Sequence, residues 1–100
     1  MEVHPRTRAR IDRIKQKIPI LRVLEDLGYH VRADGGDREQ QFSCDLHGDG
    51  KDTKPSSRVY PGSDSAYCFA CGKSRDVVEF FREKRGLDFQ HALRELERRY

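Results

Sequence analysis

Apolar residues recur at helical spacing in the first third of the chain. Ile11, Ile14 and Ile18 are three and four residues apart, so a helix here has one apolar stripe with its basic side chains outside it. A second stripe begins after Pro19, a residue that fits the start of a helix, and ends at Gly28, which suits a left-handed cap. The pattern predicts two consecutive helices.

The last quarter of the chain predicts two more helices, each with its own start signal. Asp76 is followed three residues later by Glu79, an acidic version of the capping box, and Gly86 ends that helix. Asp88 then caps a final helix that carries apolar residues on one face and charged residues on the other.

The middle of the chain predicts two β-hairpins. Residues 33–37 and 61–64 are rich in Gly, Asp and Pro, the residues that favour tight turns, and each turn lies between two short segments with strand character. Strands this short and polar are only marginally stable without further support. The predicted strands are residues 29–32, 40–43, 57–60 and 66–69.

Composition indicates a small domain with a thin core. The chain has 100 residues, of which 37% are charged and only 35% hydrophobic, and it lacks Trp. This length fits one domain, and such a core needs support beyond hydrophobic burial. The apolar runs are too short for a membrane span or a signal peptide. Three cysteines argue against a disulfide framework and for a reducing compartment.

The three cysteines and one histidine form two ligand pairs with metal-site spacing. Cys44 and His47 are three positions apart, as are Cys68 and Cys71, and twenty residues separate the two pairs. Zn²⁺ in structural sites takes four N or S donors in a tetrahedron, and its binding contributes folding free energy. The spacing therefore predicts one structural Zn²⁺ held by Cys44, His47, Cys68 and Cys71, with no open position for catalysis.

Other interpretations of these residues are less well supported. A redox dithiol at Cys68 and Cys71 lacks the surrounding βαβ pattern, and an iron–sulfur cluster normally takes four thiolates. His47 is alternatively a plain surface residue. The other three histidines form no short pair with a cysteine and are predicted not to be ligands: His4, His30 and His91.

Five motifs in fixed order resemble the zinc-binding domain of bacterial and phage DNA primases of the DnaG type. The first ligand pair, Cys44-Asp45-Leu46-His47, is similar to the family motif Cys-Pro-Phe-His. The second, Cys68-Phe69-Ala70-Cys71-Gly72, is similar to the family motif Cys-Phe-Gly-Cys-Gly. The resemblance runs from about Ile14 to Leu96. It also covers family motifs similar to residues 54–59 (family Thr-Pro-Ser-Phe-x-Val), 75–80 (family Gly-Asp-hydrophobic-hydrophobic-x-Phe) and 88–93 (family Ser-Phe-x-x-Ala-hydrophobic).

The chain departs from the family pattern at several points. Asp45 replaces a proline, Ser57 stands where an aromatic residue is expected, and the loop after His47 is about three residues longer than is usual. The acidic motifs of the catalytic TOPRIM domain do not occur in this sequence. We therefore expect the chain to be an excised domain or a stand-alone relative that synthesises no primer by itself.

The resemblance implies a fold and a domain division. The expected fold is small α+β, with an antiparallel zinc-ribbon sheet stapled by one structural Zn²⁺ and flanked by N- and C-terminal helices. Residues 1–18 are expected to form a basic N-terminal helix or tail, and residues 19–100 the primase-type zinc-binding domain.

The resemblance also implies a function in DNA replication. The expected role is binding of single-stranded DNA template during RNA primer synthesis, together with a TOPRIM catalytic domain in cis or in trans and a replicative helicase as a further partner. The expected location is the cytoplasm of a bacterium, for a cellular, phage or plasmid protein. The alternative is a protein–protein adaptor that docks a helicase or a separate polymerase domain.

Basic and aromatic residues around the second predicted hairpin are the candidate template contacts. Exposed aromatic rings stack on bases, and Lys and Arg bind phosphates. The alternatives are that the rings pack against the helices and that the cations are simply solvated. The candidates for base contacts are Tyr60, Tyr67 and Phe69, and those for phosphate contacts are Lys51, Lys54, Arg58, Lys73 and Arg75.

Overall fold

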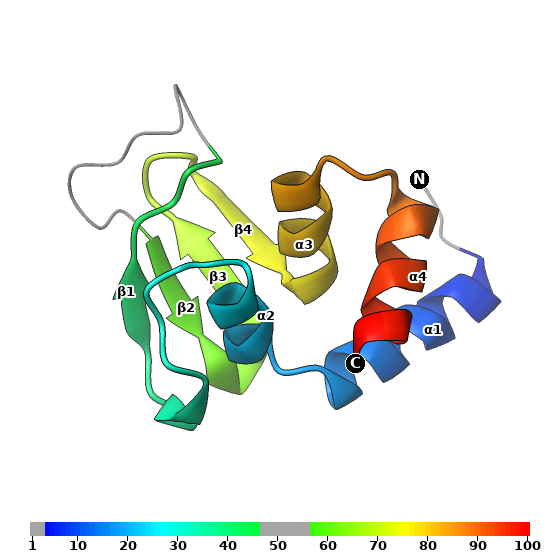
Figure 1. Cartoon of the computed structure of the whole chain (residues 1–100), viewed down its shortest axis with the longest axis horizontal. Coiled ribbons are helices and arrows are strands. Elements are labelled where there is room, and N and C mark those ends of the chain that lie inside the picture. The colour runs from blue at the N-terminus through cyan, green and yellow to red at the C-terminus, as the bar shows by residue number, and fades with distance from the viewer. Residues whose placement is uncertain (1–3, 47–56) are drawn as a thin grey trace.

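The computed structural model describes residues 4–46 and 57–100, and this part of the chain contains four α-helices and a four-stranded antiparallel sheet (Figure 1). The sheet order is β1-β2-β3-β4. This architecture confirms the predicted α+β class. In chain order the elements are α1 Pro5–Lys17, α2 Ile20–Asp26, β1 Gln40–Phe42, β2 Ser57–Tyr60, β3 Ser65–Cys68, β4 Lys73–Asp76, α3 Val77–Arg85 and α4 Phe89–Arg99.

The two N-terminal helices agree with the sequence prediction. Ile14 and Ile18 of the first apolar stripe are buried in the same core as the rest of the chain, so α1 is part of the packed body. Pro19 is the N-cap of α2. Gly28 follows the end of α2 with φ +97°, the left-handed conformation that favours glycine.

The C-terminal helices have the predicted caps. The Asp76 carboxylate accepts a hydrogen bond from the backbone N–H of Glu79 at 2.8 Å, and Asp88 accepts one from the N–H of His91 at 2.7 Å. Gly86 ends α3 in the left-handed conformation with φ +65°. These caps satisfy backbone groups that a helix end otherwise leaves unpaired.

Removing the cap of α4 is expected to lower stability measurably. Replacing Asp88 with Ala removes the side-chain acceptor for the His91 N–H and should cost about 1 kcal/mol in the free energy of unfolding, measured with urea. Asp88→Asn is the matched control, because asparagine caps about as well as aspartate. Equal losses in both variants would show that the cap hydrogen bond is not responsible.

The second predicted hairpin is confirmed, with its return strand beginning one residue earlier than expected. Arg58 lies opposite Tyr67, and Val59 opposite Ala66, in the β2–β3 register. Residues 61–63 form a short 3₁₀ turn, and Asp64 closes it at φ 52°. The sequence did not predict β4, whose residues Lys-Ser-Arg-Asp include no apolar position to signal a strand.

The first predicted hairpin is wrong, although one of its two predicted strands, at residues 40–43, is present as β1. Within the described residues, 29–32 is not a strand, and β1 pairs with β2 instead. The side-chain amide of Gln40 takes the place of a strand partner: its Oε1 accepts from the Arg32 N–H at 2.8 Å, and its Nε2 donates to the Arg32 carbonyl at 2.9 Å. The predicted turn becomes a 3₁₀ turn at Ala33–Gly35.

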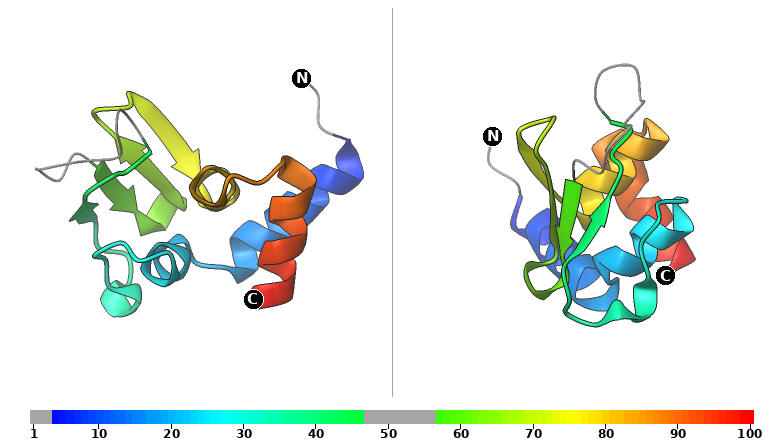
Figure 2. Two further views of the ribbon diagram at one scale, coloured as in Figure 1. Left: turned by 45° about the horizontal axis from the view of Figure 1, so that its top comes forward. Right: turned by 90° about the vertical axis from the view of Figure 1, so that its left-hand side faces the viewer.

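Helix α3 lies between the sheet and the α1–α4 pair (Figure 2). Phe80 of α3 packs edge-on against Tyr29, with ring centroids 5.2 Å apart, and lies 5.8 Å from Phe42 of β1. These three rings join the sheet to the helices in one core. Among the described helices, each is too short or too polar to cross a bilayer.

Candidate metal centre

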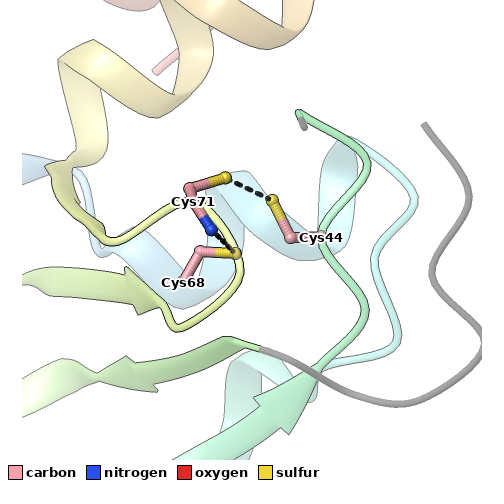
Figure 3. A group of neighbouring side chains, drawn as sticks. All are labelled: Cys44, Cys68 and Cys71. Carbon is pink, nitrogen blue, oxygen red and sulfur yellow. Dashed lines mark hydrogen bonds between the residues drawn. The ribbon is translucent and has the colours of Figure 1, made fainter. Parts of the chain in front are cut away.

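The three cysteines come together at one end of the sheet (Figure 3). Cys44 follows β1, Cys68 ends β3, and Cys71 lies in the turn that leads into β4. Their Sγ atoms all lie within 4.8 Å of one another, and Cys44 Sγ is 3.9 Å from Cys71 Sγ. Two sulfurs at about 2.3 Å from one tetrahedral ion would be roughly 3.8 Å apart, so this spacing fits a shared metal.

Backbone N–H groups of the two turns point at the sulfurs. The N–H of Leu46 donates to Cys44 Sγ at 3.4 Å, and the N–H of Cys71 donates to Cys68 Sγ at 3.3 Å. Such hydrogen bonds favour the thiolate, the form of cysteine that binds metals. The turns therefore present the sulfurs as ligands and fix their direction.

The environment of the three sulfurs disfavours their thiolate forms unless a cation lies among them. The pKa of Cys44 is raised to about 12, chiefly by burial and also by the neighbouring sulfurs of Cys68 and Cys71, whereas the hydrogen bond from the Leu46 N–H acts in the opposite direction. Closely packed thiolates repel one another, and a divalent ion among them reverses that penalty. Soft sulfur donors in this arrangement suit Zn²⁺. His47, the predicted fourth ligand, lies outside the described residues.

Comparisons with known proteins agree with this geometry. Residues 6–100 match the family described as CHC2 zinc finger, the zinc ribbon of DnaG. The chain belongs to the CHC2 zinc finger family. It is 36% identical over 89 residues to a DNA primase of Thermotoga maritima, and 28% identical over 86 residues to a DNA primase of Listeria monocytogenes.

A solved structure extends the likeness to the fold. The crystal structure of the Aquifex aeolicus primase, described as its zinc-binding and RNA polymerase domains, matches with a TM-score of 0.71 and 26% identity over 91% of this chain. The CHC2 chain spans only 21% of that protein, and 15% and 13% of the Thermotoga and Listeria primases. The shared part is therefore the zinc-binding domain of a DNA primase.

One polar cluster of this CHC2 zinc finger braces the Cys44 turn against α3. The Asp45 carboxylate accepts hydrogen bonds from the Tyr29 hydroxyl and the Lys84 ammonium. Burial alone would raise the pKa of Asp45, but these two donors hold it below its usual value. Tyr29 and Lys84 could not be predicted as neighbours of the cysteine cluster from the sequence, because nothing in their spacing links them to Cys44.

Two of the predicted phosphate contacts of the CHC2 zinc finger lie on the helix-facing side of the sheet. Arg75 is only 3% exposed, and its Nε donates to Glu83 Oε2 at 2.7 Å. Lys73 is two residues from Arg75 along β4 and therefore lies on the same face of the strand. Its Nζ lies 3.3 Å from Oε2 of the same Glu83 carboxylate. The structure therefore places the guanidinium of Arg75, one of the predicted phosphate contacts, in an enclosed position where it pairs with Glu83.

The other predicted contacts within the described residues share the opposite face. Arg58, Tyr60 and Tyr67 alternate with the buried residues of β2 and β3. Phe69 follows β3 and is 67% exposed, with its ring centroid 5.0 Å from that of Tyr67. We call Arg58, Tyr60, Tyr67 and Phe69 the outer aromatic face. Lys51 and Lys54 lie outside the described residues.

Proposed function

We propose that this CHC2 zinc finger is the single-stranded DNA template-binding module of a DNA primase and acts in RNA primer synthesis during DNA replication. One structural Zn²⁺, held by Cys44, His47, Cys68 and Cys71, would fix the sheet that carries the binding surface. The relatives it matches are bacterial DNA primases, which supports a role in the bacterial cytoplasm.

The outer aromatic face is the observation that carries this proposal. In a chain with few apolar residues, Phe69 is the one large hydrophobic side chain among the described residues that lies exposed. It contacts Tyr67, whose strand partner is Arg58. Exposed aromatic rings beside a cation can bind single-stranded DNA, because the rings stack on the flat faces of the bases and the cation binds a backbone phosphate.

The Arg58 guanidinium makes a surface ion pair with Glu39 that a DNA phosphate could replace. Its Nη1 lies 3.6 Å from Glu39 Oε2, and both side chains are substantially exposed, at 39% and 53%. Exposed pairs of this kind contribute little to stability, so a phosphate can replace the carboxylate at small cost. Lys73 remains a weaker candidate, since it faces Glu83.

Removing the exposed ring is expected to weaken binding to a fluorescent oligodeoxynucleotide about 5- to 150-fold, the range for one lost base-stacking contact. The Phe69→Ala variant would be titrated by fluorescence anisotropy, at several salt concentrations. Arg58→Glu should weaken binding too and reduce the slope of log K against log salt by about 0.7, since one phosphate contact is lost.

Two matched variants test the location of this surface. Phe69→Tyr keeps an aromatic ring and should retain most of the affinity. Arg94→Glu makes the same charge change as Arg58→Glu at an exposed position on α4 and should bind nearly as wild type. Binding that does not respond to salt, or equal losses from the Arg58 and Arg94 variants, would contradict the proposal.

The catalytic partner is the second part of the proposal. The Aquifex protein, which contains zinc-binding and RNA polymerase domains, supports a primase catalytic domain as partner of this module, on the same chain or on another. The adaptor hypothesis, with docking of a helicase or a polymerase domain, uses the same observation. Arg58→Glu separates the two: lost DNA binding with partner binding intact favours the template-binding role.

A further inference from the structure

A buried guanidinium lies against the cysteine cluster. Arg75 Nη2 is 3.7 Å from Cys71 Sγ, and the same side chain makes two hydrogen bonds to Glu83, at 2.7 and 3.2 Å. The guanidinium also lies 5.9 Å from the ring centroid of Phe80. The position of this cation is therefore set by α3, and it is directed at one of the three sulfurs.

The single negative charge of Glu83 does not neutralise the two cations that bind it. Its carboxylate accepts from both Arg75 and Lys73, so these three groups together carry one net positive charge. Three thiolates and one neutral imidazole around a divalent ion carry one net negative charge. The cation that reaches the sulfurs is the enclosed one, Arg75, where low exposure to water strengthens the interaction.

We propose that Arg75 is a positioning residue of the metal centre: it orients the Cys71 sulfur, offsets the negative charge of the cluster and thereby raises the zinc affinity of this chain. The inference rests on the proposed zinc ligands. The family motif quoted above has glycine where this chain has Arg75, so the contact depends on a residue that the motif does not require. Cys71 is the least buried of the three cysteines, so the surrounding core packing alone does least to hold its sulfur in place.

The first test is zinc affinity, measured by competition with a chromogenic chelator. Arg75→Met removes the charge and keeps much of the side-chain volume, and we expect zinc affinity to fall about 10- to 100-fold, the usual effect of losing a partner of a metal ligand. Lys73→Met is the matched control. It removes a cation from the same carboxylate at a position 49% exposed, and we expect a change within about twofold.

Glu83→Gln distinguishes charge balance from simple structural support. If the Arg75–Glu83 pair only holds β4 to α3, loss of either partner should weaken zinc binding alike. If the charge of Arg75 stabilises the cluster, neutralising Glu83 leaves more of that charge for Cys71, so zinc affinity should stay equal or rise while the melting temperature falls.

The Co²⁺-loaded proteins give a readout that does not depend on stability. The thiolate-to-metal charge-transfer band should move to longer wavelength in Arg75→Met, where the sulfur loses its cation, and to shorter wavelength in Glu83→Gln. The Glu83 variant retains Arg75, so its spectrum decides the question even where the Met variant does not fold.

Three results would overturn the inference. The first is equal zinc affinity in the Arg75→Met and Lys73→Met variants. The second is a Glu83→Gln variant that behaves as a purely structural ion pair requires, shown either by a loss of affinity as large as in Arg75→Met or by an unmoved charge-transfer band. The third is wild-type protein that binds no zinc, which also removes the proposed metal site, whereas the first two leave that site intact.

Discussion

Replacing Cys44 with serine is expected to abolish stoichiometric zinc binding and the cooperative unfolding transition. Structural zinc contributes about 10–16 kcal/mol in small zinc-finger peptides, which matches or exceeds the whole stability of an ordinary domain. Cys44 joins the end of β1 to the β3–β4 turn through the shared sulfur cluster. Without it the short polar strands have little else to hold them.

The measurement combines elemental analysis of purified protein with thermal unfolding followed by circular dichroism. Ser43→Ala is the matched control, since it alters the exposed neighbouring side chain and leaves the sulfurs in place. A chelator should reproduce the Cys44→Ser result in the wild-type protein. A protein stripped of metal that keeps its full structure and melting transition would contradict the prediction.

Truncating Phe80 is expected to be the most damaging change in the apolar core. Phe80 is 2% exposed and contacts Tyr29 and Phe42 edge-on or at a tilt, so Phe80→Ala removes the ring that joins α3 to β1. Loss of a buried phenylalanine typically costs about 3–5 kcal/mol. The free energy of unfolding would be measured in denaturant with zinc in excess.

Phe69→Ala is the matched comparison for this core variant, because it makes the same chemical change at a ring that is 67% exposed. We expect its free energy of unfolding to lie within about 0.5 kcal/mol of wild type, as for most surface substitutions. Comparable losses in the two variants would mean that Phe69 contributes to the core. It would then no longer support the outer aromatic face as a binding surface.

The features predicted correctly from the sequence are those set by a few adjacent residues. Asp76 and Asp88 predicted two helix starts, and Gly28 and Gly86 predicted two helix ends, because caps depend on the chemistry of a few adjacent residues. The β2–β3 hairpin followed in the same way from its turn. The strand at residues 40–43 was also predicted, but its pairing with β2 was not, because the choice between residues 29–32 and β2 as its partner is made by contacts distant in sequence.

The predicted binding residues show the same division. Alternation along β2 placed Arg58 and Tyr60 on one face, but their strand register with Tyr67 came only from the paired sheet. From the sequence, Lys73 and Arg75 were both predicted to be phosphate contacts, with solvated surface cations as the alternative. Their common partner Glu83 lies on α3, and the packing of that helix against β4 encloses Arg75, whereas Lys73 on the same face of the strand stays 49% exposed.

The amino-acid sequence by itself determined the helices, the family resemblance and the grouping of the three cysteines as metal-ligand candidates, since these depend on residue type and short spacing. Tertiary structure decided which strands pair, which cations are enclosed, and which aromatic ring meets solvent. Those outcomes depend on contacts between segments far apart in the chain, and a spacing pattern holds no information about which of several possible partners a segment will meet.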